Sequence, residues 1–241
     1  MHQQAFRHRA RRRCGVLRPA VLGAITVVLL LAGCSGGSDD GPPPEDVMAD
    51  ARAQLDETTG VHISLATDEL PDGVDGVLEA TGVGTHAPAF DGDITVSLNG
   101  GSFIVPVVAV DGTVHAKVPL TSGYAEIDPA EYGAPDPAQL MATEDGISAW
   151  LTEATGLEEG DPTREGDAVL TSYTGTVPGQ AVRSVIPSAD PTAEFEATFE
   201  VDDAGRLVQA LVTGPFYGSA GDVSYTVSLS DYGTDEEITA P

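Results

Sequence analysis

Hydrophobic and polar positions between residues 90 and 119 follow the pattern of consecutive antiparallel strands. Apolar and polar side chains alternate over residues 94–98, which predicts a strand with one buried face. Asn-Gly-Gly at 99–101 and Asp-Gly at 111–112 are typical of the tight turns that join hairpin strands. The strand between these turns, residues 103–110, is apolar almost throughout and does not alternate.

Both faces of the strand over residues 103–110 are therefore expected to be dry, since its hairpin neighbours exclude a parallel sheet with crossover helices. Two arrangements satisfy this pattern. In one, a curved antiparallel sheet has an apolar concave side, covered by helices that do not fill it. In the other, the same side chains meet in a solid core, and the pattern alone leaves both open.

The rest of the chain predicts a helix followed by strands, short helices and further strands. Apolar periodicity indicates helices over residues 45–59, with Gly60 as the stop, 147–154 and 179–186. Alternation indicates further strands over residues 61–67, 77–85, 168–177, 193–201, 207–213 and 222–230. Prolines after Tyr124 predict short helical or irregular segments, and residues 160–167 an acidic loop. This order predicts an α+β fold with one large antiparallel sheet.

Residues 1–33 have the pattern of a lipoprotein signal peptide. Six arginines precede an apolar run over residues 20–31 that is short for a membrane span. Leu31-Ala32-Gly33-Cys34 follows and matches a bacterial lipobox, which predicts Cys34 as the lipid attachment site. An uncleaved signal anchor is the alternative. Residues 34–44, rich in Gly, Ser and Pro, are then expected to be a lipidated flexible tether, and residues 45–241 a single domain.

Removal of residues 1–33 changes the charge of the predicted mature chain. The loss of six arginines and no acidic residue leaves five basic against 38 acidic residues, a formal net charge of −33. Nucleic acid would be repelled, so no nucleic-acid partner is expected. With Cys34 lipidated, the domain has no cysteine for a disulfide, a thiolate metal site or nucleophilic catalysis.

Candidate catalytic and metal motifs are weak. The acidic loop over residues 68–79 resembles a calcium loop, but Leu70 stands at the third position, where an oxygen ligand is needed, Pro71 stands at the fourth, and the flanks read as strands. His62, His86 and His115 lie singly on strands or at their ends, where a polar-face role is more common than catalysis. We therefore expect no enzyme, no metal and no cofactor.

The excess of apolar residues is aliphatic rather than aromatic, and aliphatic walls complement acyl chains. Burying one methylene contributes about 0.8 kcal/mol, so sheltering a sixteen-carbon chain would contribute about 13 kcal/mol before entropy and desolvation reduce it. A lipid-binding cavity is thus one interpretation of the pattern, and a solid core is the other.

Several stretches of the chain resemble the LppX/LprA/LprF/LprG family of actinobacterial envelope lipoproteins. The matching stretches are the lipobox at Cys34 and residues 103–117, 123–127, 136–140, 145–151 and 223–229. The resemblance implies a strongly bent antiparallel half-barrel, similar to LolA and LolB, with helices on its concave face enclosing a hydrophobic cavity. It further implies binding of acylated lipids and glycolipids, of a triacylated glycolipid or lipoglycan class, and their transport from the plasma membrane toward the outer envelope.

On this resemblance we expect a monomer on the extracytoplasmic side of the membrane, with a major-facilitator efflux pump as a candidate partner. Its inward strand implies a cavity wall made by Ile94, Val96 and Leu98, extended by Ile63, Leu65, Phe103, Val105 and Val107. The helix over residues 147–154 would supply a lid through Ile147, Trp150 and Leu151. Two rivals remain open at this point: an interaction or signalling lipoprotein with a solid core, and a lipid hydrolase that uses one of the three histidines.

Overall fold

The computed structural model describes residues 41–118, 122–132 and 134–241. Within them one sheet of 12 strands has the order β6-β5-β4-β3-β2-β1-β12-β11-β10-β9-β7, with β8 paired to β9, and all pairings are antiparallel. The strands are β1 Gly60–Ala66, β2 Gly76–Thr85, β3 Ala89–Leu98, β4 Gly101–Val110, β5 Thr113–Ala116, β6 Ala125–Ile127, β7 Thr155–Glu159, β8 Thr163–Glu165, β9 Ala168–Pro178, β10 Glu194–Asp202, β11 Leu207–Gly214 and β12 Val223–Ser230. The helices are α1 Pro44–Glu57, α2 Ile147–Glu153 and α3 Gly179–Val185, with 3-10 turns η1 Pro129–Tyr132, η2 Pro137–Met141 and η3 Gly218–Ala220.

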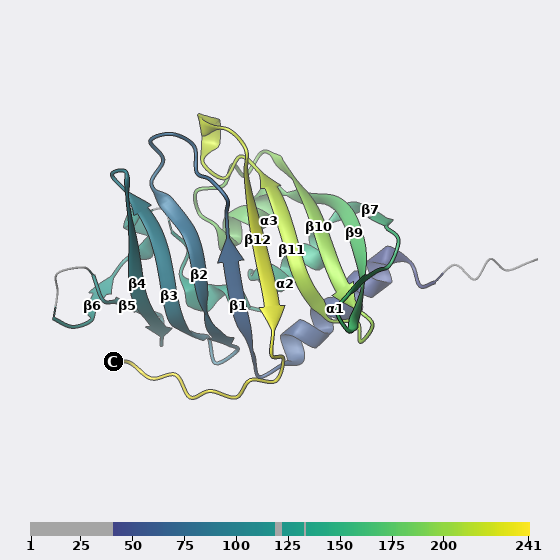
Figure 1. The fold of residues 1–241 in the computed structure, drawn as a ribbon, viewed down its shortest axis with the longest axis horizontal. Coiled ribbons are helices and arrows are strands. Elements are labelled where there is room, and N and C mark those ends of the chain that lie inside the picture. The colour runs from purple at the N-terminus through teal and green to yellow at the C-terminus, as the bar shows by residue number, and fades with distance from the viewer. Residues whose placement is uncertain (1–40, 119–121, 133) are drawn as a thin grey trace, which may run out of the picture. The chain divides into compact units, whose positions relative to one another are not determined.

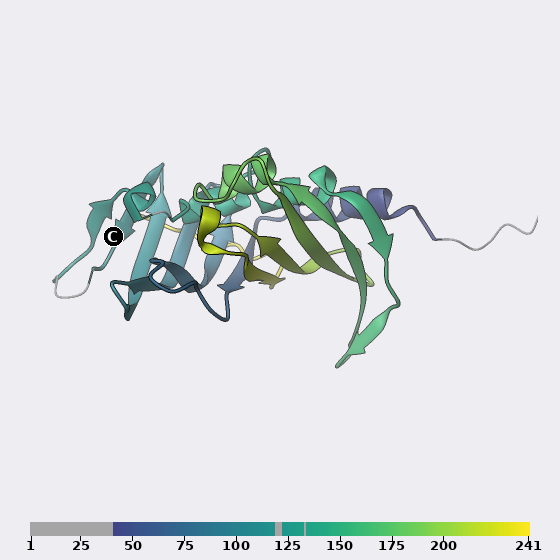
Figure 2. The same ribbon diagram turned by 90° about the horizontal axis from the view of Figure 1, so that it is seen from above.

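The three helices lie along one face of the bent sheet (Figures 1 and 2). The predicted α+β class and the bent antiparallel sheet are confirmed. Helix α1 buries Met48, Ala51 and Leu55, the face that its periodicity predicts. Its predicted stop at Gly60 is wrong, because α1 already ends at the extended Thr58 and Gly60 opens β1.

Short edge strands are where the sequence-based prediction fails most. The expected acidic loop over residues 160–167 contains β8, and β6 and β7 were not predicted as strands. These strands have three to five residues with mostly exposed side chains, so they carry no apolar alternation. Their pairing comes from the neighbouring strand alone.

The two predicted hairpin turns have the backbone that their residues favour. Asn99 and Gly100 have φ angles of 51° and 76°, and Asp111 and Gly112 have 54° and 72°. Positive φ at both central residues suits the twist of a two-residue hairpin, and Asn, Asp and Gly adopt it at low cost. The turns fix the register of β3, β4 and β5 relative to one another.

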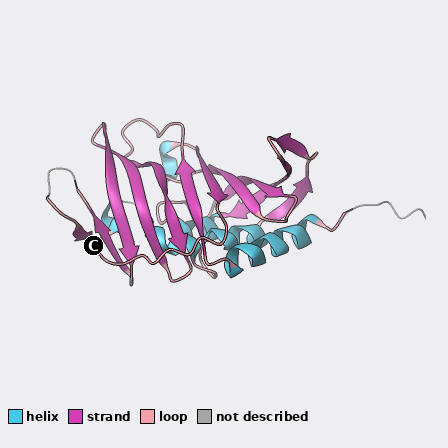
Figure 3. Cartoon of the chain, turned by 60° about the horizontal axis from the view of Figure 1, so that its bottom comes forward, coloured by secondary structure: helices cyan, strands magenta, loops and turns pink. Residues whose placement is uncertain are grey.

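Strand β4 is dry on both faces over only part of its length. Val107 and Ala109 face the helical side, whereas Val108 and Val110 pack on the other side with Ala89 and Ile238. The second face is therefore covered by the C-terminal segment, which crosses the sheet on the side opposite the helices (Figure 3). Toward its start β4 leaves Phe103 and Ile104 exposed, so the prediction of two dry faces holds only near Val107–Val110.

A large core cluster joins the helices to β1 and β9–β12. Phe216 is at its centre, with ring centroids 4.9 Å from Phe195 and 5.0 Å from Tyr225 in edge-to-face geometry. Trp150 of α2 donates its indole N–H to the carbonyl of Ala181 at 3.1 Å, which ties α2 to α3. This half of the molecule contains the main packed core.

Two glycines on the helical face of β2 and β3 leave room for one aromatic ring to lie against the backbone of both strands. Gly82 pairs with Gly92, and a Cβ placed on Gly82 would lie 2.7 Å from the Phe90 ring and 2.8 Å from the Gly92 Cα. Phe90 is 1% exposed and fills this space. Because neither glycine has a side chain, the Phe90 ring can pack closely against the backbone of β2 and β3.

We expect Gly82→Ala to destabilise the fold by about 1–3 kcal/mol, because the new methyl group would overpack against Phe90 and the neighbouring backbone. Urea unfolding measures the change in the free energy of unfolding. Gly41→Ala is the matched control, since a Cβ there meets nothing within 4 Å, and a change within about 0.5 kcal/mol is expected. Equal effects of the two substitutions would contradict the close approach at Gly82.

Candidate functional site

An apolar cavity of about 480 Å³ lies on the helical face of β3, β4 and β5. Its opposite wall is formed by residues 127–132 and 134–137, which include η1 and the start of η2. The lining residues are Asp75, Gly76, Val77, Ile94, Val96, Ser97, Leu98, Phe103, Val105, Val107, Val114, Ala116, Val118, Ile127, Pro129, Glu131, Ala134, Pro135 and Pro137.

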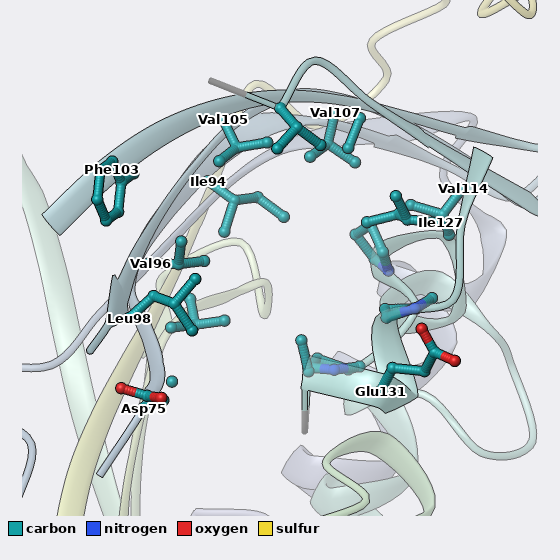
Figure 4. A pocket seen from close by; sticks show the side chains of 18 of the residues that line it. Asp75, Ile94, Val96, Leu98, Phe103, Val105, Val107, Val114, Ile127 and Glu131 are labelled. Atoms are coloured by element: carbon teal, nitrogen blue, oxygen red, sulfur yellow. The ribbon is translucent and has the colours of Figure 1, made fainter. Parts of the chain in front are cut away.

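The strand register builds the wall of this larger cavity. Ile94 pairs with Val105, Val96 with Phe103, and Val107 with Ala116. Directly paired residues lie on the same face of an antiparallel sheet, so these pairs form one continuous aliphatic surface. Figure 4 shows Ile94, Val96 and Leu98 pointing into the cavity from one side, and Val114 and Ile127 from the other.

The cavity exists because the helices cover only part of the sheet. Their buried faces pack with β1 and β9–β12, whereas the segment with η1 and η2 covers β2, β3 and β4. Three of the lining residues from this segment are prolines, whose short side chains reach little way into the space. Asp136 caps η2, since its carboxylate accepts a hydrogen bond from the Ala138 amide at 3.0 Å.

Exposure of the lining residues identifies the mouth and the floor. Val107, Val114 and Ala116 form the floor and are at most 5% exposed. The mouth is formed by the lining residues that reach solvent, namely Leu98, Phe103, Val118, Asp75 and Glu131. The cavity therefore has an apolar floor and a mouth that combines apolar side chains with two carboxylates.

A smaller inner cavity of about 50 Å³ adjoins the larger one. The two share the lining residues Val77, Ile94, Ala134, Pro135 and Pro137. Tyr217 and Tyr225 lie at the far side of the inner cavity, with their hydroxyl oxygens 2.7 Å apart. Tyr225 donates to the carbonyl of Val77 at 2.7 Å, so Tyr217 is left to donate to Tyr225.

Burial keeps both tyrosines neutral. Desolvation raises the pKa of Tyr225 far above its ordinary value, and the neighbouring Tyr217 raises it further. Desolvation also raises the pKa of Tyr217, although hydrogen bonding partly offsets this. The inner cavity therefore contains two satisfied hydroxyl groups and no charge on these side chains.

The sequence-predicted site residues separate into three groups. Six of them line the larger cavity: Ile94, Val96, Leu98, Phe103, Val105 and Val107. Leu65, Ile147 and Trp150 line the inner cavity, together with Ile94. Ile63 and Leu151 are buried in the main core and line neither cavity.

Helix α2, which was predicted to be the lid, does not line the larger cavity. Ile147, Trp150 and Leu151 of α2 pack into the main core, while residues 127–132 and 134–137 cover the larger cavity. Sequence reasoning missed this covering segment and also Val77, Val114 and Ala116. The alternation of Val114 and Ala116 was a usable signal, but nothing in the proline-rich segment indicates which face of the sheet it covers.

The described residues offer little for other chemistry. In the described ranges no group of three or more His, Cys, Asp or Glu side chains is arranged to hold a metal. Neither cavity is lined by a histidine, and the His86 ring bonds the carbonyl of Leu55 at 2.8 Å. Among residues 41–118, 122–132 and 134–241, no helix has the length and apolar character needed to cross a membrane.

Two solved structures share this fold at low sequence identity. LprF from Mycobacterium bovis matches with a TM-score of 0.68 and 16% identity, over 83% of this chain and 98% of that one. LppX from Mycobacterium tuberculosis matches with a TM-score of 0.59 and 18% identity, over 84% of this chain and 100% of that one. By sequence alone, no curated protein matches the chain.

A family model provides the assignment that these low identities leave open. The model of the LppX_LprAFG lipoproteins matches residues 43–239, which span the helices, the sheet and both cavities described above. The chain therefore belongs to the LppX_LprAFG lipoprotein family.

Proposed function

We propose that this protein is a lipid-anchored carrier that binds acylated lipids or glycolipids in the larger cavity and moves them from the plasma membrane toward the outer envelope. The observation that carries the proposal is the 480 Å³ cavity with an aliphatic floor, which lies beside the main packed core. An interaction module with a solid core would have no use for such a space. Family membership supports the same role.

The cavity volume bounds the amount of lipid inside. A cavity of about 150 Å³ accommodates benzene, which is roughly 25 Å³ per carbon. On this scale 480 Å³ holds about 19 carbons, or one long acyl chain. The triacylated class implied by the resemblance would need more room, and the adjoining inner cavity is the direction in which the space could grow, by movement of Pro135 and Pro137.

Binding without catalysis is the activity we propose. A hydrolase needs a nucleophile with a base in hydrogen-bonding reach. His62 lies on β1, His86 follows β2 and His115 lies on β5 beside Val108, on the face opposite the cavity. Among the described residues that line the larger cavity, Ser97 is the one with a hydroxyl side chain, and none is a histidine.

Attachment of the carrier to the membrane rests on Cys34, which lies outside the described residues. A lipidated cysteine would hold the domain beside the bilayer on the extracytoplasmic side, where a lipid can be collected. A major-facilitator efflux pump is the partner that the family resemblance suggests, and we propose no particular docking surface for it.

Replacing Ile94 by Trp should block lipid uptake, because the larger ring would occupy the space between β3 and the covering segment. We expect at least a fivefold loss of lipid that co-purifies with the protein, measured by mass spectrometry of organic extracts. The free energy of unfolding should change by less than about 1.5 kcal/mol, since the ring fills empty space rather than a packed core.

Ile104→Trp is the matched control for Ile94→Trp. Ile104 is on the neighbouring strand, is 68% exposed and lines neither cavity. Its substitution should leave the lipid yield unchanged. Equal lipid yields from both variants would count against binding in the larger cavity.

Replacing Cys34 by Ala should release the protein from the membrane fraction, because the thiol that carries the lipid is lost. Cys14→Ala provides the control, since Cys14 lies within the predicted signal peptide. Radiolabelled palmitate should enter the wild-type chain and the Cys14 variant only. A Cys34 variant that stays membrane-bound with residues 1–33 still attached would favour the signal-anchor alternative.

A further inference from the structure

The mouth of the larger cavity has a distinct electrostatic character. Asp75 and Glu131 are the charged residues of its lining, and both are exposed. They come from separate segments, and Figure 4 shows them on opposite sides of the same end of the cavity. A polar head group that stays outside the apolar floor would therefore be placed near two carboxylates.

The position of Asp75 is fixed by the strand hairpin. Its Oδ1 accepts a hydrogen bond from the backbone amide of Asn99 at 2.8 Å, beside Leu98 of the mouth. This bond also occupies the amide of Asn99, so that amide is not available to an anionic head group. The carboxylate therefore stays at the mouth in a defined place.

No basic side chain balances these carboxylates within the lining. All five basic residues that follow Cys34 belong to the described part of the chain, and none of them lines the larger cavity. Lys117 lies between the lining residues Ala116 and Val118 in the sequence. Its amide donates to the Pro106 carbonyl at 2.9 Å, so the strand pairing continues and the Lys117 side chain lies on the face opposite Ala116. Arg52 and Arg206 are paired with Asp56 and Asp202 on α1 and β10.

We infer that this carrier selects lipids whose head group donates hydrogen bonds and bears no negative charge, such as a glycosyl or glyceryl group, and discriminates against anionic phosphate head groups. The inference rests on the proposed lipid-binding function. Carboxylates and phosphodiesters both only accept hydrogen bonds, so at this mouth they repel each other and have no shared donor. Sugar and glycerol hydroxyls donate to carboxylates without bringing a charge.

A matched pair of single-chain lipids tests the inference. Monooleoylglycerol and oleoyl-lysophosphatidylglycerol each carry one oleoyl chain on a glycerol and end in free glycerol hydroxyls. The lysophosphatidylglycerol has in addition an anionic phosphodiester and a second glycerol. Their dissociation constants are measured by displacement of a fluorescent acylglycerol, at 10 mM and at 150 mM salt. We expect the uncharged lipid to bind at least tenfold more tightly at low salt, which corresponds to about 1.4 kcal/mol. The ratio should shrink at higher salt, since exposed charges are screened.

The double variant Asp75→Asn/Glu131→Gln should bind the lysophosphatidylglycerol more tightly and bring the ratio below three. Asn at position 75 keeps an oxygen for the Asn99 amide, so the hairpin is retained. The control Glu165→Gln/Asp167→Asn removes the same charge around the β8–β9 turn, outside both cavities, and should leave the ratio near its wild-type value.

Three outcomes would overturn the inference: equal binding of the two lipids by the wild-type protein, an unchanged ratio in the Asp75/Glu131 variant, or an equal fall in the control. The last would assign selectivity to the overall acidity of the chain. Failure of both lipids to displace the probe would instead overturn the proposed function itself, so the two failures are distinguishable.

Discussion

The antiparallel register of β3, β4 and β5 is the constraint on which the rest of the site depends. Because the side chains of a strand alternate between faces, a shift of one residue would turn Ile94, Val105 and Val107 away from the cavity and bring Thr95, Ile104 and Val108 into it. Two hairpin turns with positive φ at both central residues prevent this shift. The aliphatic wall is thus a consequence of turn chemistry as much as of hydrophobic composition.

Unequal covering of one continuous sheet explains how the same fold contains a solid core and a hollow. Over β1 and β9–β12, three helices contribute Met48, Leu55, Trp150 and Val182 to a packed cluster. Over β3–β5 the covering segment contributes prolines and short 3-10 turns, and the local cluster is small. Ile94 packs against both clusters, so the boundary between solid and hollow runs through this side chain.

The sequence predicted those parts of the structure that local chemistry determines. Alternation predicted most of the long strands, and a continuous apolar run between two turns predicted β4. Asn99-Gly100 and Asp111-Gly112 predicted the hairpins, because their φ preferences do not depend on distant residues. The dryness of Val108 and Val110 was predicted, but its cause was not, since Ile238 covers them from more than a hundred residues away. The place of α2 could not be predicted for the same reason: periodicity shows that Trp150 is buried, but does not show against what.

In the proposed carrier function, the cavity competes for lipid with a bilayer rather than with water, and this comparison makes the mouth important for selectivity. Burial of each methylene is worth about 0.8 kcal/mol relative to water, but the acyl region of a membrane offers nearly the same gain. In the proposed carrier, the floor made by Val107, Val114 and Ala116 would therefore shelter an acyl chain without deciding which lipid leaves the membrane. The choice between lipids then depends on electrostatic interactions of about 1 kcal/mol at the surface. In this chain the charged surface groups beside the opening are Asp75 and Glu131. Release follows the same logic, because a lipid held by a small net free energy can pass on to any acceptor that binds its head group slightly better.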